Sequence, residues 1–355
     1  MEKVYNVALI GFGGMAGNHY KQLSKGNINA RAFGVWDIDP ARREAGKAAG
    51  MKVYTSQDEL LADPEVDIVV VAVPNDQHRE IVKAALRAGK HVICEKPAAI
   101  YAWELEEMMA VAKETGKILT VDQNRRVNRD YVLMRRQVES GVIGKPYLIE
   151  SRVEGSRGVP AGWRTSKAQG GGMMLDWGVH LIDQLMYMNK SAVVEVFCRM
   201  YSLNYPEVDD NFHMEMRFAD GLDAIIEIAT NNFVKHPRWM VYGMEGSMQI
   251  DDWDCTGRTV RCLSKEDTWT TEIAADKAGP SKTMAARSAD SVQVTDLSAP
   301  TDVTDNIEPT YVQLINAIEG KAELTIKPEE ALRVMKVMEA AFESAEKHEV
   351  IKVNI

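Results

Sequence analysis

The sequence has few cysteines and no pairing pattern among them. Cys94, Cys198, Cys255 and Cys262 lie far apart and form no Cys-x-x-Cys motif. This spacing argues against a disulfide framework and against a structural zinc site, and we expect no bound metal. It also weighs against a zinc-dependent alcohol dehydrogenase. Cys94 is expected to fill a small buried position in a strand.

Long apolar runs are also missing. No run approaches the ~20 residues that a helix needs to cross a bilayer. The chain starts Met1-Glu2-Lys3 and soon enters an apolar strand, which leaves no room for a charged n-region, an apolar h-region and a cleavage site. We therefore expect a cytoplasmic protein.

The chain has no excess of positive charge. It carries 42 Lys and Arg against 52 Asp and Glu, a formal net charge of -10. This balance disfavours nucleic acid and anionic membrane surfaces as partners and favours small neutral or weakly charged ligands. A length of 355 residues exceeds what one hydrophobic core usually organises, so two domains are expected.

A glycine-rich turn follows the first apolar strand, residues 7–10. It reads Gly11-Phe12-Gly13-Gly14-Met15-Ala16-Gly17 and leads into a helical pattern through Leu23. Strand, turn and helix form the context in which G-x-G-x-x-G/A binds a dinucleotide. Gly11 would permit the tight turn, Gly13 would let the backbone approach a pyrophosphate at the helix N-terminus, and Ala16 would keep the helix close to the strand. The alternative is a turn with a purely structural role.

An acidic residue after the second strand favours NAD. Residues 32–36 end in Asp37, about 24 residues beyond Gly13, where dinucleotide folds place the acid that binds the ribose 2′-OH. A carboxylate there would repel a 2′-phosphate by ~1 to 4 kcal/mol at about 4 Å. Arg42 and Arg43 open the next helix and would offset part of this repulsion, unless they only line a solvated face. NAD is therefore favoured over NADP.

Strands and helices alternate regularly up to residue 126. This alternation predicts a doubly wound parallel sheet, in which ligands lie outside the carboxyl ends of the strands. Three segments follow such strand ends: Pro74-Asn75, Glu95-Lys96-Pro97 and Asn124. His78 comes just after the first of these segments, where a role on a helix surface is as plausible. The predicted strands are 66–73, 91–94 and 118–121, and the helices are 77–88 and 102–115.

The pattern changes in the second half, where strands alternate apolar and polar residues. We expect an α+β domain with a large, mainly antiparallel open sheet. The polar stretch 274–306 is predicted to be a long surface excursion. Strands are predicted over 147–153, 194–200, 212–218, 222–230, 238–242, 247–250 and 350–353, and closing helices over 310–319 and 328–346.

One helix of this half carries an imidazole and two carboxylates. Asp176, His180 and Asp183 are spaced four and three residues apart and would share one helix face. Such a trio suits proton transfer, because histidine titrates near pH ~6.5 and a neighbouring carboxylate fixes its tautomer. Alternatively, Asp176 caps the helix after Gly170-Gly171-Gly172 and His180 is a core residue.

Glu95-Lys96-Pro97 together with Asp176-x-Gly178-x-His180-x-x-Asp183 resembles the glucose-fructose oxidoreductase/inositol dehydrogenase (Gfo/Idh/MocA) family. The resemblance covers nearly the whole chain and includes the turn 11–17, Trp163-Arg164, and the segments 243–246 and 328–332. It implies an N-terminal Rossmann domain, residues 1–126, and a substrate-binding domain, residues 127–355, with its last helices packed back on the first. The implied assembly is a homodimer or homotetramer built through the C-terminal sheet.

The resemblance also implies the roles of individual residues. Lys96 and His180 would line the nicotinamide and a secondary alcohol or ketone of a sugar or cyclitol, with Asp176 holding the substrate hydroxyl or the histidine. The stretch 274–306 is not a family signature, and residues 123–126 match only loosely. Cofactor contacts are implied for Pro74, Asn75, Glu95, Lys96, Asn124, Trp163 and Arg164, with His78 added from its place on the same rim.

The function so implied is NAD-dependent oxidation of a secondary hydroxyl of a sugar, glycoside or inositol. The Lys96 ammonium would stabilise the developing alkoxide and His180 would accept the proton. Trp163 and Trp177 would stack on the sugar ring or fill a core. Two alternatives remain: an enzyme that retains NAD and cleaves glycosides by transient oxidation and elimination, and a non-catalytic sensor of NAD or sugar.

Overall fold

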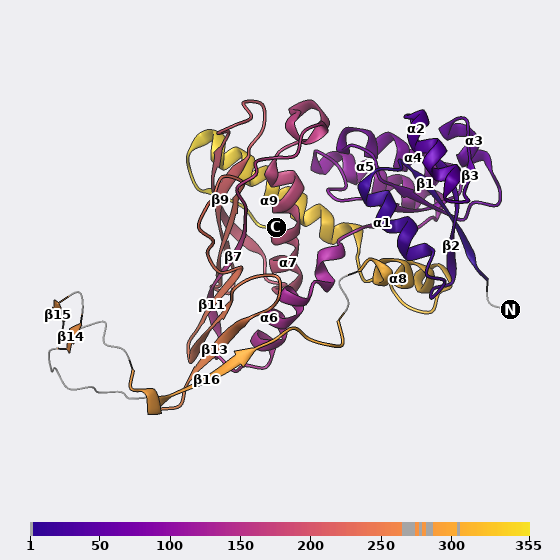
Figure 1. Ribbon diagram of the computed structural model, residues 1–355. Helices are drawn as coiled ribbons and strands as arrows, with labels where there is room; N and C mark the ends of the chain where they lie inside the picture. The colour runs from indigo at the N-terminus through magenta and orange to yellow at the C-terminus, as the bar shows by residue number, and fades with distance from the viewer. Residues whose placement is uncertain (1–2, 265–273, 277–278, 282–286, 304–305) are drawn as a thin grey trace.

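The computed structural model describes residues 3–264, 274–276, 279–281, 287–303 and 306–355. Its first sheet has six parallel strands in the order β3-β2-β1-β4-β5-β6 (Figure 1). This order, with helices on both faces, defines a dinucleotide-binding fold. The strands are β1 Tyr5–Ile10, β2 Ala30–Trp36, β3 Lys52–Val53, β4 Ile68–Val71, β5 His91–Cys94 and β6 Leu119–Val121.

Continuous apolar runs place the strands of this sheet in its interior. All four residues of β4 are buried, because helices cover the sheet on each side and leave no polar face. The covering helices follow the strands in chain order: α1 Gly14–Leu23, α2 Pro40–Ala48, α3 Gln57–Ala62, α4 His78–Arg87 and α5 Ala102–Thr115.

The second sheet has nine strands in the order β16-β13-β12-β11-β7-β10-β9-β8-β17. All neighbours are antiparallel except β7 and β10, so the predicted fold class is confirmed. The strands are β7 Pro146–Glu154, β8 Val193–Tyr201, β9 Asn211–Phe218, β10 Asp223–Ala229, β11 Trp239–Gly243, β12 Gly246–Ile250, β13 Gly257–Cys262, β16 Val292–Leu297 and β17 Ile351–Lys352.

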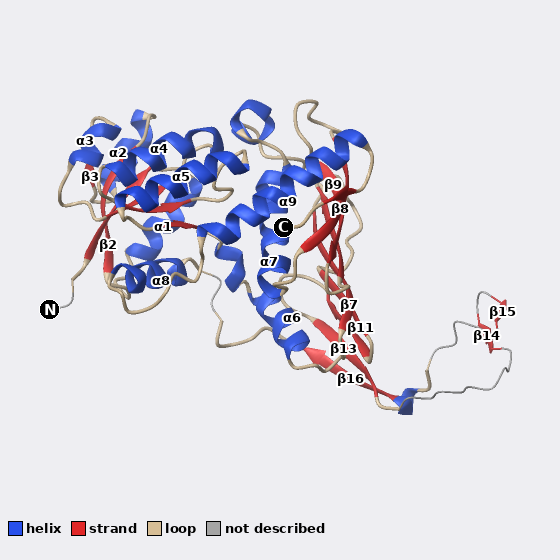
Figure 2. Cartoon of the chain, turned by 180° about the vertical axis from the view of Figure 1, so that it is seen from behind, coloured by secondary structure: helices blue, strands red, loops and turns tan. Residues whose placement is uncertain are grey.

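In the described part of the chain, helices cover one face of the second sheet (Figure 2). These helices are α6 Arg129–Glu139, α7 Val179–Met188 and α9 Pro328–Lys347. Alternate residues of the strands face them, as Ile226 and Ile228 of β10 do from the buried side. The alternation of buried and exposed residues along each strand therefore shows which face of this sheet the helices cover.

The helix α8, Glu308–Ile318, returns the chain to the first sheet. Tyr311 and Leu314 are fully buried in the same apolar cluster as Leu9 and Val70. The helix α9 then runs between the two sheets, contacting α5 and β6 on one side and α7 and β8 on the other.

The predicted surface excursion 274–306 is wrong in part. Residues 292–297 form β16, which pairs with β13 as an edge strand of the nine-stranded sheet. The sequence Val292-Gln293-Val294-Thr295 does alternate, but the stretch around it is polar and four of the six strand residues are exposed. The short strands β14 Ala274–Asp276 and β15 Gly279–Ser281 pair with each other, and residues 277–278, 282–286 and 304–305 lie outside the described part of the chain.

Among the residues that the structure describes, no helix is both long enough and apolar enough to cross a membrane.

Candidate active site

The turn between β1 and α1 is built for close approach of a ligand. Gly11 has φ +88°, and a Cβ there would lie 2.3 Å from the carbonyl oxygen of Ala72, so only glycine fits. Gly13 is the N-cap of α1 and supplies no side-chain cap, while a Cβ on Gly14 would meet nothing within 4 Å. The first-turn N–H groups thus have no capping side chain, and their partial positive charge suits a pyrophosphate.

Asp37 closes this turn at the end of β2. Its carboxylate accepts hydrogen bonds from the main-chain N–H of Phe12 at 2.7 Å and of Asp39 at 2.8 Å. Nη1 of the half-exposed Arg42 lies 3.5 Å from the same carboxylate. Arg43 instead donates to the main-chain oxygens of Asp37 and Ile38. The turn, an acid and one arginine therefore form a single cluster that fits the adenosine end of a dinucleotide.

Lys96 follows the carboxyl end of β5 and contacts the second half of the chain. Its Nζ donates to Oδ1 of Asp176 at 2.9 Å, and Arg164 donates from Nε to Oδ2 at 3.1 Å. These two cations hold the pKa of Asp176 below its usual value, although burial raises it. Arg164 belongs to the 3₁₀ turn Trp163–Thr165, and its guanidinium lies 4.5 Å from the centre of the Trp163 ring.

Asp176 lies in a π-helical turn, Met174–Gly178, that leads into α7. A π-helical turn is wider than an α-helical turn, so the α-helical spacing expected between Asp176 and His180 does not apply here. Such turns are frequent at functional sites. Oδ2 of the buried Asp209 accepts from the main-chain N–H of Met174 at 2.6 Å. A Cβ on Gly172 would lie 2.2 Å from the carboxylate of Asp209, so this glycine is required by the close approach.

His180 is buried, with 4% of its surface exposed, and its environment is cationic. Burial lowers its pKa well below the usual value, and the charges of Lys96, Arg125 and Arg238 lower it further. Its Nδ1 has no hydrogen-bond partner among the described residues. The expected carboxylate that fixes the histidine tautomer is therefore wrong, because Asp176 binds Lys96 and Arg164 instead. The lowered pKa favours the neutral form of the imidazole.

Asp183 does not share the site of His180. It accepts two hydrogen bonds from Arg126, at 2.7 and 2.6 Å, and Arg126 also donates to Glu330 of α9 at 2.6 Å. This buried network joins the residues before α6 to α7 and α9. The expected helix face with two carboxylates and an imidazole is therefore wrong. Asp176 binds Lys96, and Asp183 belongs to a structural ion pair.

Three other predicted cofactor residues are held by internal contacts at the strand ends. Asn75, just after Pro74, donates to the main-chain oxygen of Gly170 at 2.8 Å, linking the two halves of the chain. Asn124 donates to Asp122 at 3.1 Å. Both ring nitrogens of the buried His78 lie 3.0 Å from main-chain oxygens, those of Pro97 and Val73. His78 therefore fixes the segment that carries Lys96 and has no ring nitrogen left for a cofactor.

A buried polar cluster beneath this segment was missed from the sequence. His19 of α1 lies 2.9 Å from Oε1 of Glu95 and 2.7 Å from the hydroxyl of Tyr311 of α8. Burial opposes protonation of His19, but the hydrogen bond and charge of Glu95 and the charge of Asp122 raise its pKa. The cluster joins α1, β5, β6 and α8, and its members lie 292 residues apart at the extremes, so no local pattern marks it.

An aromatic and cationic cluster beside His180 was also missed in part. The Trp177 ring lies 6.0 Å from that of His180 and 6.0 Å from that of Trp253, in the turn between β12 and β13. The guanidinium of Arg125 lies 4.1 Å from the centre of the Trp177 ring and 5.5 Å from that of Trp253. Only Trp177 was predicted, because Arg125 and Trp253 stand in segments without a recognisable motif.

The glycine turn fits a pyrophosphate, and Lys96 binds Asp176 in the turn that precedes the buried His180, an arrangement that suits an oxidoreductase using a nicotinamide dinucleotide. Comparison with known proteins agrees with this class. Residues 5–123 match the model of an oxidoreductase family with an NAD-binding Rossmann fold, and residues 131–249 match the GFO/IDH/MocA C-terminal domain. The chain belongs to the Gfo/Idh/MocA family and is an NAD(P)-dependent oxidoreductase that acts on CH–OH groups.

Several relatives cover most of the chain. The crystal structure of an NAD-binding protein from Listeria innocua is 38% identical, covers 99% of this chain and 100% of its own, and has a TM-score of 0.94. An uncharacterised oxidoreductase of Schizosaccharomyces pombe is 31% identical over 85% of each chain. A myo-inositol 2-dehydrogenase of Thermotoga maritima is 29% identical over 69% of this chain and 72% of its own.

Proposed function

We propose that this protein is an NAD-dependent dehydrogenase that oxidises a secondary hydroxyl of a sugar, glycoside or inositol. The observation that carries this proposal is the meeting of Lys96 with Asp176 beside a buried, neutral His180. The relative named as a myo-inositol 2-dehydrogenase supports a substrate rich in secondary hydroxyls. In this proposal residues 1–126 bind the cofactor and residues 127–355 bind the substrate.

The cofactor is held by groups at the strand ends of the first sheet. The uncapped first turn of α1 binds the pyrophosphate, and Asp37 binds the ribose hydroxyls of NAD and disfavours a 2′-phosphate. Bound NAD supplies the acceptor for the two electrons that leave the carbinol carbon. Arg42 near Asp37 reduces the discrimination against NADP without reversing it.

Lys96 and His180 handle the charge and the proton of the reacting hydroxyl. The Lys96 side chain is only 12% exposed, and in such an environment its charge stabilises an alkoxide more strongly than in water. A neutral imidazole can accept the hydroxyl proton, and the low pKa of His180 keeps it neutral. Asp176 and Arg164 fix the position of the lysine.

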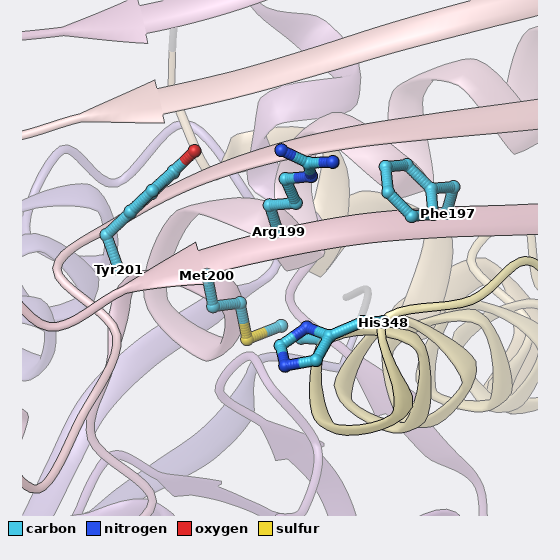
Figure 3. Close-up of a pocket in the computed structure, with 6 residues that line it drawn as sticks. Phe197, Arg199, Met200, Tyr201 and His348 are labelled. Atoms are coloured by element: carbon cyan, nitrogen blue, oxygen red, sulfur yellow. The ribbon is translucent and has the colours of Figure 1, made fainter.

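The uncovered face of the nine-stranded sheet is the proposed surface for assembly with a second copy of the chain. It carries half-buried apolar side chains, Leu148, Phe197 and Ile225, interspersed with ion pairs such as Arg152 with Glu227. Figure 3 shows a hollow at its β8 edge, where Phe197, Arg199 and Tyr201 lie on one side of the strand and Met200 and His348 on the other. Light scattering should give a dimer or tetramer that Ile225→Asp dissociates.

We also propose the cytoplasm as the compartment. Cys94, Cys198 and Cys262 form no disulfide bond, as expected in a reducing environment.

The decisive experiment is to screen polyols, glycosides and inositols with NAD and to record NADH absorbance. We expect at least one secondary alcohol to be oxidised, with Lys96→Met and His180→Ala losing this activity while still binding NAD. Exposed Asp58→Asn serves as a matched control. Release of aglycone without NADH would identify instead an enzyme that retains its cofactor, and full activity of both variants would refute the proposal.

A further inference from the structure

A buried imidazole lies between the helix that follows the glycine turn and the segment that carries Lys96. His19 belongs to α1, and its side chain is fully buried. Its Nε2 lies 2.9 Å from Oε1 of Glu95 and 3.9 Å from Oδ2 of Asp122. Its Nδ1 lies 2.7 Å from the hydroxyl of Tyr311. The proposed transfer of a hydride and a proton does not use any of these contacts.

Glu95 connects this imidazole to the main chain of the lysine. Its Oε1 contacts His19, and its Oε2 accepts from the main-chain N–H of Lys96 at 3.3 Å. Pro97 is held separately, since Nδ1 of the buried His78 lies 3.0 Å from its carbonyl oxygen. The two residues that flank Lys96 in the chain are therefore each held by a buried histidine.

The charges in this cluster favour a strong contact between His19 and Glu95. A carboxylate can only accept, so Nε2 carries the proton that is shared with Glu95. Burial lowers the pKa of His19, but the hydrogen bond and charge of Glu95 and the charge of Asp122 raise it overall. A charge-assisted hydrogen bond is roughly twice as strong as a neutral one, so a protonated His19 holds Glu95 firmly.

The lysine side chain is held at both ends. Its main chain is held through Glu95 and His19, and its Nζ donates to Oδ1 of Asp176 at 2.9 Å. The helix that carries His19 begins at Gly14, directly after the turn proposed to bind the pyrophosphate. The contact between His19 and Glu95 therefore relates the position of Lys96 to that of the cofactor.

From these contacts we propose that His19 is a positioning residue, which fixes Lys96 relative to the cofactor by holding the Glu95 carboxylate. His19 is fully buried and acts through Glu95, not directly on the substrate. Its effect is on the geometry of hydride transfer, where a displacement of about 1 Å can cost ~100-fold in rate. This inference rests on the proposed dehydrogenase function and adds a residue to its machinery.

The test measures kcat for the best polyol of the screen and the dissociation constant of NAD. His19→Leu removes the contact to Glu95, and we expect kcat to fall by ~10- to 100-fold. NAD affinity should change by less than ~3-fold, because the turn before α1 is intact. His19→Gln keeps an N–H donor and should recover most of the lost kcat, which a loss of packing alone would not explain.

Gln22→Met is the matched control. Gln22 lies one turn further along α1, is also buried, and donates to Glu308 of α8 at 3.3 Å. The substitution removes a buried contact between α1 and α8 without touching Glu95. We expect it to leave kcat unchanged.

A double variant shows whether His19 acts through Glu95. Glu95→Met removes the acceptor for the N–H of Lys96 and should lower kcat. Adding His19→Leu to Glu95→Met should cause no further loss, because both substitutions break the same connection. Thermal unfolding checks each fold. If His19→Leu alone leaves a buried carboxylate unpaired and does not fold, the comparison of Glu95→Met with the double variant decides the question.

The outcomes distinguish this inference from the proposed function. An unchanged kcat in His19→Leu, losses that multiply in the double variant, or a loss of NAD affinity as large as the loss of kcat would overturn the inference and leave the dehydrogenase intact. If the wild-type protein oxidised none of the polyols, the proposed function itself would fail.

Discussion

Lys96 donates from Nζ to both the main-chain oxygen and Oδ1 of Asp176, at 2.9 Å in each case, although 80 residues separate the two. The contact joins the end of β5 in the first sheet to the π-helical turn before α7. It holds the ammonium where its charge acts on His180. The relative position of the two halves of the chain therefore decides whether the lysine and the histidine can act on one substrate.

Replacing Asp176 by Asn should impair catalysis more than folding. The amide can still accept from Lys96 but no longer balances Lys96 and Arg164, so the lysine is less firmly held. We expect kcat/KM for the best polyol to fall by ~10²- to 10³-fold, since removing one organised electrostatic group at an active site costs this much. Steady-state kinetics measure the loss, and thermal unfolding checks the fold. An Asn variant as active as Asp58→Asn would contradict the positioning role.

The pH profile of oxidation should not show the decrease of kcat/KM, its acidic limb, at the pH where an ordinary histidine base becomes protonated. The pKa of His180 is lowered by burial and by Lys96, Arg125 and Arg238, so the imidazole stays neutral when the pH falls below the usual value of about 6.5. We expect kcat/KM to stay level from pH 8 to pH 6 and to decrease only at lower pH. In Arg125→Gln the limb should move to higher pH, because one cation is gone. A wild-type limb centred near pH 6.5 would contradict this assignment.

Cofactor preference should depend on Asp37. Its carboxylate lies at the end of β2 with Arg42 at 3.5 Å, so removing it leaves an arginine where a 2′-phosphate would bind. Asp37→Ser keeps an acceptor for the N–H of Phe12 and should raise kcat/KM with NADP relative to NAD by ~10- to 100-fold. Adding Arg42→Gln should cancel the gain. Unchanged preference in Asp37→Ser would show that Asp37 does not contact the ribose.

Asp209 should make stability decrease with rising pH. Burial raises its pKa to about 7, and the charge of Asp210 adds to this, against the hydrogen bonds from Met173 and Met174. The folded protein therefore holds a proton that the unfolded chain releases near pH 4, and stability falls as the pH rises from about 4 to about 7.

Comparison with Asp209→Asn isolates this contribution. The amide oxygen still accepts from Met174, and the variant should lose the pH-dependent decrease, which amounts to at most ~1.4 kcal/mol per pH unit. Urea unfolding of both proteins between pH 4 and 8 measures it. Parallel stability curves would show that Asp209 has an ordinary pKa.

Much of the first half could be predicted from local patterns. The strand β5 and the helix α5 have the bounds that the sequence predicts, because a continuous apolar run and an amphipathic period are properties of neighbouring residues. The strand β16 could not be found in this way. It is mostly exposed and lies in a polar stretch, and its hydrogen bonds to β13 make it a strand.

The same distinction between local patterns and contacts of distant residues applies to the candidate site. Lys96, Asp176 and His180 could be proposed from the sequence because each stands in a short motif, and the family resemblance follows from those motifs. Their partners were predicted less well. Contacts between distant segments decide three features of the site. These are the neutral state of His180, the ion pair between Asp183 and Arg126, and the position of Arg125 against Trp177.

The sequence by itself determined the class of the protein, because the features that mark this class are local and can be recognised from neighbouring residues. They are the dinucleotide-binding turn, the acid at a strand end, and the lysine and the histidine in their motifs. Only the tertiary structure decided which charges surround the imidazole. The physical reason is that hydrogen bonds and ion pairs depend on distances of a few ångströms between residues tens to hundreds of positions apart, and packing alone sets those distances.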